Sequence, residues 1–194
     1  MGFLREAPLD ETNFAPFAQI KANYGFIPNL FRAQTLRPDI IEANIALGNL
    51  ILRQPGALGR QDKEYLFLVC SAANLSTYCV TAHCEIIRML KLEGPEPEEI
   101  AVDFASTNLP LVTKALLSFA RKLTTEPTRI GADDVETLRT YGYSDEQILE
   151  AVLVVSWAKF ANFNAFGLGT LPDFDTLKTR LYPKEPVDSS VAQE

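Results

Sequence analysis

The chain has 194 residues, of which 47% are hydrophobic and 22% charged, and its formal net charge at pH 7 is −7. These proportions are typical of a soluble globular protein with one domain of ample core or two small ones. The negative charge argues against binding to nucleic acid or to an anionic membrane surface, so neither is expected as a partner.

The cysteine content and the N-terminal residues indicate the compartment. Three cysteines do not make a disulfide framework in a chain of this size, which favours a reducing environment. The first residues lack the basic head and long apolar run of a signal peptide, and no window of about 18 residues is apolar enough for a transmembrane helix. A cytoplasmic protein is therefore expected.

Helices separated by proline and glycine breaks are expected along the first half of the chain. After a polar N-terminal extension at 1–13, the predicted helices cover residues 14–24, a short stretch from Pro28, and residues 38–53, 60–74 and 76–92. Gly25 is the expected C-cap of the first helix, because glycine readily adopts the left-handed conformation found there. The core face of the third helix is predicted to consist of Ile41, Ile45, Leu47 and Leu50.

The second half continues in the same way, with predicted helices at 98–105, 110–125, 132–141 and 145–166. Ser144 and Gln147 form the S-x-x-Q pattern of a capping box, which marks the start of the last helix. No run alternates between polar and apolar residues for long enough to indicate a strand. The predicted fold class is therefore all-α, with one helical domain at 14–172 and a partly disordered C-terminal segment at 173–194.

The chain contains a faint internal repeat. Aligning residues 64–69 with residues 150–155 superposes two apolar stretches that each begin with a glutamate. The second copy lacks the reactive side chains of the first. Its residues at the positions of Ser76, Cys79 and His83 are Asn162, Ala165 and Gly169. An active repeat at about 38–94 and a degenerate repeat at about 110–172 would follow, although any two buried helices can look alike.

The residues best suited to chemistry lie between Glu64 and His83, the only histidine in the chain. On a helix, Cys79 and His83 are about 40° apart, so the thiol and the imidazole share one face. That arrangement can activate the sulfur. Ser76 is a good N-cap, which places Cys79 in the first turn, where the helix N-terminus favours a thiolate. Tyr78, next to the thiol, could donate a hydrogen bond or line a pocket.

Glu64 has two possible positions. In an antiparallel hairpin that turns near residue 75, Glu64 lies opposite about residue 87, from where its carboxylate could reach the His83 imidazole directly or through water. It could equally be exposed at the helix N-terminus, where the helix dipole favours a carboxylate.

Each of these residues also has a structural interpretation. Cys79 could be a small buried hydrophobe, His83 a structural histidine and Ser76 a helix cap rather than a nucleophile. Cys70 and Cys84 are expected to be core residues. One histidine with scattered cysteines does not supply a zinc site, and no glycine-rich phosphate loop is present, so no metal or other cofactor is expected.

The pattern Glu64-x11-Ser76-x2-Cys79-x3-His83 resembles the active site of the AhpD-like alkylhydroperoxidase and carboxymuconolactone decarboxylase superfamily. The peroxidase branch of that superfamily has a cysteine at the position of Ser76. The residues at 24–31, 118–123 and 146–152 resemble its two-repeat, peroxidase-related members, and the resemblance covers roughly 14–172. It implies an all-helical fold and a homo-oligomer.

The resemblance also implies an activity, the thiol-dependent reduction of a small-molecule hydroperoxide. In this family the cysteine at the position of Cys79 attacks the peroxide, while the residues at the positions of Glu64 and His83 relay protons. The candidate catalytic residues are therefore Cys79, His83, Glu64 and Ser76, with Tyr78 in the pocket.

Ser76 departs from the family pattern, because serine cannot form the disulfide that resolves the oxidised thiol. Cys84 lies about 140° around the helix from Cys79 and cannot replace it. Cys70 could reach Cys79 only if the chain folds back sharply at residues 74–75. An external thiol reductant is thus expected.

Two further functions stay open. One is a decarboxylase-like acid/base enzyme that uses His83 and Glu64 without redox cycling, and the other is a non-catalytic oligomeric helical protein. The aromatic residues of the second repeat would either wall the site or fill the core. They are Trp157, Phe160, Phe163 and Phe166.

Overall fold

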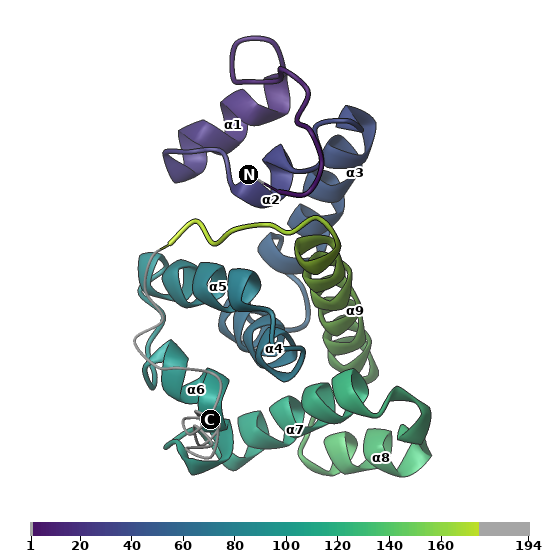
Figure 1. Cartoon of the computed structure of the whole chain (residues 1–194). Coiled ribbons are helices and arrows are strands. Elements are labelled where there is room, and N and C mark those ends of the chain that lie inside the picture. Colours follow the sequence, from purple (N-terminus) through teal and green to yellow (C-terminus); the bar gives the residue numbers. More distant parts are fainter. Residues whose placement is uncertain (1, 175–194) are drawn as a thin grey trace, which may run out of the picture.

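The computed structural model describes residues 2–174, and within that range the chain is helical and has no strand (Figure 1). The α-helices are α1 (Ala15–Tyr24), α2 (Asn29–Arg32), α3 (Pro38–Gly48), α4 (Arg60–Ala73), α5 (Thr77–Met89), α6 (Pro97–Asp103), α7 (Leu111–Thr125), α8 (Ala132–Thr140) and α9 (Asp145–Gly167). Three short turns are η1 (Asn49–Arg53), η2 (Phe104–Ser106) and η3 (Pro127–Arg129). The predicted all-α class is confirmed. Of the segment 173–194 that is expected to be partly disordered, residues 175–194 lie outside the described part.

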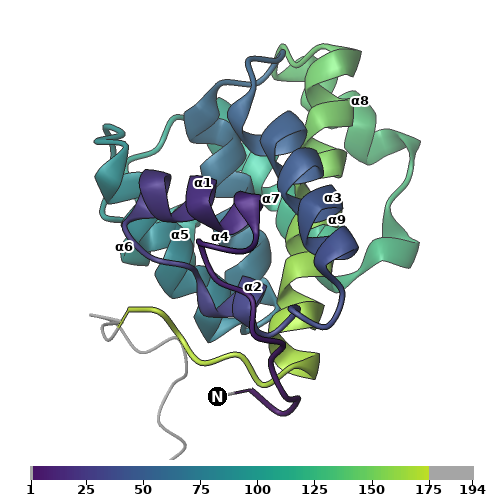
Figure 2. The same cartoon turned by 90° about the horizontal axis from the view of Figure 1, so that it is seen from above.

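Helix α4 lies at the centre of the main core. It packs against α5, α6, α7 and α9, and all its residues from Lys63 to Ser71 are buried (Figures 1 and 2). The apolar run 65–70 explains this position, because a helix that is apolar around its circumference needs neighbours on several sides. The central helix therefore holds any side chain that it carries in a fixed, dry environment.

A sharp reversal joins α4 to α5. Leu75 has a φ of 60°, in the left-handed region, and the backbone N–H of Ser76 donates to the carbonyl of Ser71 at 2.9 Å. The chain thus folds back on itself as an αα-hairpin, and α5 runs alongside α4. Because of this reversal, residues of the first half of α5 face residues of α4.

Helix α9 begins where the sequence predicts, at the capping box of Ser144 and Gln147, and continues unbroken for 23 residues. It packs against both α4 and α7. In the repeat alignment, Asn162 corresponds to Ser76, the residue at the α4–α5 reversal. Helix α9 passes through Asn162 without a break, so the second stretch repeats the first helix but not the bend.

The predicted helix at 38–53 is only partly α-helical. After Gly48 it changes to a π-helical turn, in which the N–H of Gln54 donates to the carbonyl of Asn49 at 2.9 Å. Leu52 points into the core, whereas Leu47 and Leu50 are exposed, with 58% of Leu50 accessible. The prediction that Leu47 and Leu50 belong to the core is therefore wrong, because this helix lies on the outside of the molecule and the wider turn redirects its last residues.

A second, smaller core joins the N-terminal segment to α3. It consists of Phe17, Ile20, Ile27 and Ile41. Gly25 ends α1 with a φ of 81°, as expected of a C-cap glycine. Figure 2 shows α1 and α2 lying over α4 and α5, so this segment covers one side of the central hairpin.

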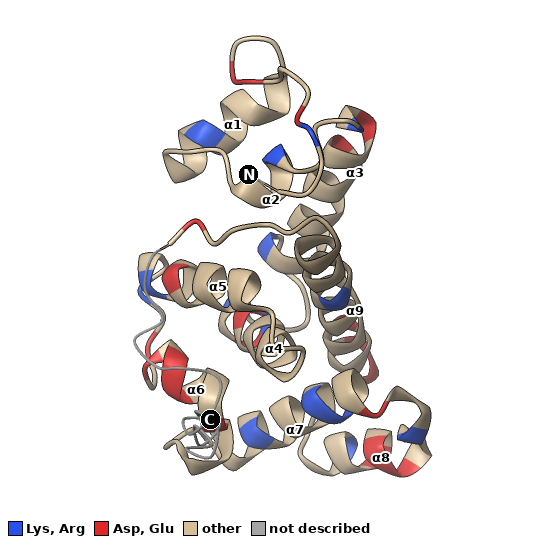
Figure 3. Ribbon diagram, in the orientation of Figure 1, with Lys and Arg blue, Asp and Glu red and all other residues tan. Residues whose placement is uncertain are grey.

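The outer helices α6 and α8 each carry a group of acidic residues (Figure 3). In residues 2–174, no single helix is long and apolar enough to cross a membrane, although the bent pair Pro97–Ser106 and Leu111–Thr125 passes that test by length and composition alone.

Candidate active site

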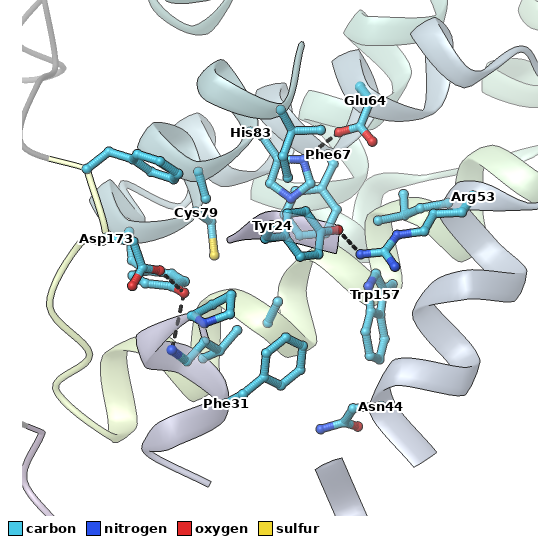
Figure 4. A pocket seen from close by; sticks show the side chains of 18 of the residues that line it. Tyr24, Phe31, Asn44, Arg53, Glu64, Phe67, Cys79, His83, Trp157 and Asp173 are labelled. Carbon is cyan, nitrogen blue, oxygen red and sulfur yellow. Dashed lines mark hydrogen bonds and ion pairs between the residues drawn. The ribbon is translucent and has the colours of Figure 1, made fainter. Parts of the chain in front are cut away.

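A cavity of about 160 Å³ lies between the central hairpin, the N-terminal segment and α9 (Figure 4). Cys79 and His83 of α5 and Glu64 of α4 all line it. The α4–α5 reversal brings these residues together, since the hairpin places the start of α5 beside α4. Eight aromatic rings form a large part of the remaining wall. The rings come from Tyr24, Phe26, Phe31, Phe67, Tyr78, Trp157, Phe160 and Phe174.

Glu64 and His83 form a buried pair. The Oε2 atom of Glu64 lies 2.6 Å from the Nδ1 atom of His83, and Glu64 has no exposed surface. The contact is direct, which excludes the alternative of an exposed Glu64 at the helix N-terminus. Because the carboxylate accepts the Nδ1 proton, the Nε2 atom of a neutral imidazole is left as a proton acceptor. Phe67 stacks on the imidazole at a centroid distance of 3.7 Å, which fixes the plane of the ring.

Arg60 completes this group, although the sequence analysis does not single it out. Its Nη2 and Nε atoms lie 2.6 Å and 2.7 Å from the Oε1 atom of Glu64. Burial acts to raise the pKa of Glu64, but His83 and Arg60 together outweigh it and lower that pKa. Glu64 is therefore ionised. The i,i+4 spacing of Arg60 and Glu64 on α4 is the signal that could have found this contact.

The Cys79 thiol is almost fully buried, with 2% of the residue accessible. Burial raises the pKa of Cys79, while the side chains of Ser76 and Asn162 act in the opposite direction. Cys79 does occupy the third position of α5, as predicted. The expected thiolate is nevertheless not favoured in the closed pocket, because desolvation of the sulfur outweighs the neighbouring polar groups. A base must take up the thiol proton.

Ser76 stands at the N-cap position of α5 but does not cap the helix. Its hydroxyl accepts no bond from the first turn and is buried, and its Oγ atom has no hydrogen-bond partner among the described residues. The expectation that Ser76 is a helix cap is therefore wrong. The Ser76 side chain nevertheless acts to lower the pKa of Cys79, although its hydroxyl makes no hydrogen bond to the sulfur.

Asn162 is a second polar neighbour of Cys79 that sequence analysis did not identify. It is fully buried, donates to the Oγ atom of Ser71 at 3.0 Å and accepts from the Nδ2 atom of Asn74 at 2.7 Å. These bonds tie α9 to the end of α4. The repeat alignment does place Asn162 at the position of Ser76, but no sequence signal indicates that its side chain meets the thiol of the other repeat.

Tyr78 lines the pocket, as predicted, but its hydroxyl is engaged elsewhere. It donates to the Oδ2 atom of Asp173 at 2.6 Å and accepts from the N–H of Leu30 at 3.2 Å. Burial and the adjacent Asp173 carboxylate raise the pKa of Tyr78. Asp173 also accepts the N–H of Asn29 at 2.9 Å, so the segment after α9 is fixed across one side of the cavity (Figure 4).

The aromatic residues of α9 divide into two groups. Trp157 and Phe160 stack on each other at 5.4 Å and line the cavity. Phe163 and Phe166 do not line it, and 61% of Phe163 is exposed. Only the first pair therefore takes the position expected of pocket walls.

Cys70 and Cys84 are buried in the main core, and all three cysteines are free. Burial raises the pKa of Cys70 to about 11 and that of Cys84 to about 12. Within the described range, no group of three or more His, Cys, Asp or Glu side chains is placed to hold a metal ion.

Comparison with known proteins supports the fold. No protein-family model and no curated protein matches the chain. Among solved structures, it is similar to an alkylhydroperoxidase AhpD core, an uncharacterized peroxidase-related protein from Ralstonia eutropha JMP134. The TM-score is 0.81 and the identity 25%, over 89% of this chain and 92% of that one.

Two other solved structures are similar. A peroxidase-related protein from Silicibacter sp. TM1040 has a TM-score of 0.79 and 24% identity, over 86% of this chain and 87% of that one. A cysteine-to-alanine variant of the debrominase Bmp8, in complex with 2,3,4-tribromopyrrole, has a TM-score of 0.76 and 19% identity, over 89% of this chain and 94% of that one. The chain therefore has the AhpD-like superfamily fold that its Glu–Cys–His motif predicts.

Proposed function

We propose that this protein reduces hydroperoxides through Cys79, with His83 and Glu64 relaying protons. The observation that carries the proposal is the placement of one thiol and one Glu64–His83 pair in the wall of the same aromatic cavity. The peroxidase-related neighbours support the same class of chemistry.

The oxidation step needs a base, because burial raises the pKa of Cys79. His83 can act as that base through Nε2, since its Nδ1 atom is bonded to Glu64. The thiolate then attacks one oxygen of the hydroperoxide and the O–O bond breaks. Cys79 becomes a sulfenic acid, the other oxygen leaves as an alkoxide, and the imidazolium returns its proton to give the alcohol.

The ion pair with Arg60 keeps Glu64 charged at neutral pH, because it adds to the stabilisation from His83. A charged Glu64 stabilises the imidazolium that forms when the thiol loses its proton. Arg60 is thus a positioning residue for the base, and it does not need to touch the substrate for this role.

Regeneration requires two equivalents of an external thiol. Ser76 cannot form a disulfide. The chain does fold back sharply at Leu75, the condition for Cys70 to approach Cys79, but neither Cys70 nor Cys84 lines the cavity. The Sγ atom of Cys70 is directed to the carbonyl of Val155 at 3.7 Å. The first thiol condenses with the sulfenic acid to give a mixed disulfide and water. The second thiol displaces Cys79 from the mixed disulfide, which restores the Cys79 thiol and releases the oxidised reductant. The reductant is a small thiol, because the sulfur is nearly closed off from solvent. We place the protein in a reducing compartment such as the cytoplasm, where its three free cysteines persist.

Turnover of cumene hydroperoxide with a small dithiol tests the proposal. Cys79→Ser should abolish turnover, and His83→Gln and Glu64→Gln should each lower it by about 100- to 10,000-fold. Cys84→Ser serves as the control, because that thiol lies outside the cavity. Full activity in Cys79→Ser would overturn the proposal. The decarboxylase-like alternative would instead be supported if the protein turned over another substrate, and if that activity were lost in His83→Gln and kept in Cys79→Ser.

Reductive dehalogenation is a second candidate function. The Bmp8 neighbour is a debrominase with a bromopyrrole ligand, and the cavity described above has aromatic walls suited to a planar ring. In such a reaction a ring bromine is replaced by hydrogen, while two external thiols are oxidised to a disulfide and bromide and a proton are released. Bromide release from 2,3,4-tribromopyrrole that depends on Cys79, in a protein that does not consume cumene hydroperoxide, would favour dehalogenation over peroxide reduction.

A further inference from the structure

Arg53 lies in the wall of the cavity and has no acidic partner among residues 2–174. Its Nη1 atom donates to the Oδ1 atom of Asn49 at 2.8 Å, and its Nη2 atom donates to the hydroxyl of Tyr24. The guanidinium also lies 5.2 Å from the centroid of the Tyr24 ring. These uncharged contacts orient the guanidinium, and no carboxylate within residues 2–174 forms an ion pair with it. Arg53 is exposed to solvent along part of its side chain.

The π-helical turn η1 places Arg53 in this position. Arg53 is the last residue of the turn, directly after the buried Leu52, and Asn49 at the start of the turn holds its guanidinium. A π-turn carries one more residue than an α-turn and costs hydrogen-bond geometry, so such turns occur frequently at functional sites. A regular α-helix through Arg53 would direct its side chain differently.

The nearest charged groups do not neutralise Arg53. Burial and the nearby Arg60 both lower the pKa of Arg53, and Glu64 only partly opposes them. Both carboxylate oxygens of Glu64 are already bonded, one to Arg60 and the other to His83. Glu64 therefore pairs with Arg60 and His83, and it acts on Arg53 only at longer range.

Besides Glu64, the cavity wall contains one other acidic residue among those described, Asp173. It lies on the opposite side of the cavity from Arg53 (Figure 4). Its two oxygens accept hydrogen bonds from Tyr78 and from the N–H of Asn29. Figure 4 shows Cys79 on the Asp173 side and Trp157 beside Arg53. A ligand with a negative group would therefore be oriented with that group toward Arg53 and its other end toward the sulfur.

The size and walls of the cavity limit the rest of the ligand. Its volume is about 160 Å³, and an apolar cavity of about 150 Å³ accepts one benzene ring. The stacked rings of Trp157 and Phe160 form part of the wall next to Arg53. The planar guanidinium suits a carboxylate, which it can bind through two parallel hydrogen bonds.

We propose that Arg53 binds the carboxylate of a one-ring aromatic substrate and determines specificity for such acids. This inference rests on the proposed function, because the ring must also carry the group that reacts with Cys79. It assigns Arg53 a role in substrate binding that is separate from the Cys79–His83–Glu64 group.

A binding experiment tests the assignment without relying on turnover. Trp157 is the single tryptophan of the chain and lines the cavity, so its fluorescence reports occupancy. In the Cys79→Ser protein, benzoate should bind at least tenfold more tightly than benzyl alcohol, which has the same ring and no charge. Arg53→Gln should bring the ratio of the two affinities close to one, and Arg53→Lys should keep part of the preference.

Arg121→Gln is the matched control for net charge, because Arg121 also has no ion pair within residues 2–174 and lies on α7, outside the cavity. It should leave the ratio unchanged. Two results would overturn the assignment. One is equal binding of benzoate and benzyl alcohol by the Cys79→Ser protein that retains Arg53. The other is a preference for benzoate that stays above fivefold after Arg53→Gln. A weakening of both ligands by the same factor would mean that Arg53 only supports the cavity wall.

A kinetic arm connects the site to the reaction. The KM for para-carboxycumene hydroperoxide should be at least tenfold lower than for cumene hydroperoxide, and Arg53→Gln should remove that difference. If neither peroxide is consumed but benzoate binding depends on Arg53, the proposed function fails and the anion site stands. If both peroxides are consumed equally well, the anion site fails and the proposed function stands.

Discussion

Cys79 illustrates how burial can reverse an expectation drawn from a helix position. Its place in the first turn of α5 favours a thiolate, but the side chain is almost completely removed from water. Desolvation wins, so the pKa of Cys79 is raised. Sequence gives the position of a residue on a helix, but burial is set by segments far away in the chain, here α2 and α9.

A pH profile of Cys79 alkylation follows from this raised pKa. The thiol reacts as the thiolate, so the rate in the folded protein should still be rising at the pH where the rate in the unfolded chain has levelled off. The urea-unfolded chain should level off just above an ordinary thiol pKa of about 8.5. Iodoacetamide labelling followed by peptide mapping measures both profiles. A plateau below pH 8 in the folded protein would show an activated thiolate and contradict this account.

Ser76→Cys should introduce the missing resolving thiol. Positions 76 and 79 lie one turn apart at the start of α5, and the Ser76 side chain already acts on the pKa of Cys79. Peroxide treatment should therefore give a disulfide between these two positions, seen in a non-reduced peptide map. Because the hydroxyl of Ser76 makes no capping bond, the reduced variant should lose less than about 0.5 kcal/mol in urea unfolding. A loss of about 1 kcal/mol would reveal a helix cap after all.

Sequence could predict part of the site and not the rest, for a definite reason. Cys79 and His83 are one helical turn apart, and a hairpin was enough to bring Glu64 near them. Asn162 and Asp173 reach the site from more than 75 residues away in the chain, through packing that no local pattern records. The contact of Arg60 with Glu64 was accessible from spacing alone.

At the level of elements, α4 and α9 follow from their apolar runs and capping signals, and their predicted bounds hold within a few residues. The π-turn η1 could not be predicted from the sequence, because one extra residue in a single helical turn does not change the amino-acid composition of the segment or the spacing of its apolar residues visibly. Its consequence is large, since it exposes Leu50, buries Leu52 and directs Arg53 into the cavity wall.

Trp157 and Phe163 provide a matched pair on α9. Trp157 lines the cavity and Phe163 lies outside it, largely exposed. Trp157→Ala should open the wall and raise the rate of Cys79 alkylation by a bulky maleimide several-fold, and it should also reduce stability by about 3 kcal/mol. Phe163→Ala should leave the rate unchanged. If Trp157→Ala lowers stability but leaves the rate of Cys79 alkylation unchanged, the ring belongs to the core and not to the pocket wall.

For the whole molecule, the exposed apolar residues of α3, η1 and α9 are the most informative feature. Turn η1 continues α3 and contacts α9 (Figures 1 and 2), and α9 has exposed apolar side chains at helical spacing. The residues are Leu47, Leu50, Leu149, Leu153, Phe160 and Phe163. Contiguous apolar surface of this kind marks protein interfaces, so we propose that this face joins copies of the chain in a homo-oligomer.

Light scattering at micromolar concentration measures the assembly. The mass should be a multiple of 21.5 kDa, and Leu153→Glu should reduce it by placing a charge in the buried interface. Leu111→Glu is the control, because Leu111 is exposed on α7, away from that face. A clean mass of 21.5 kDa for the unmodified protein would exclude the oligomer.

The central claim is that Cys79 is oxidised by hydroperoxides in the cavity that it shares with His83 and Glu64. One equivalent of cumene hydroperoxide in the presence of dimedone traps the sulfenic acid, and peptide mapping locates it. The account predicts labelling of Cys79 at least tenfold above Cys70 and Cys84, and a strong decrease in His83→Gln. Absence of label on Cys79, or equal labelling of the three cysteines in the folded protein, would contradict it.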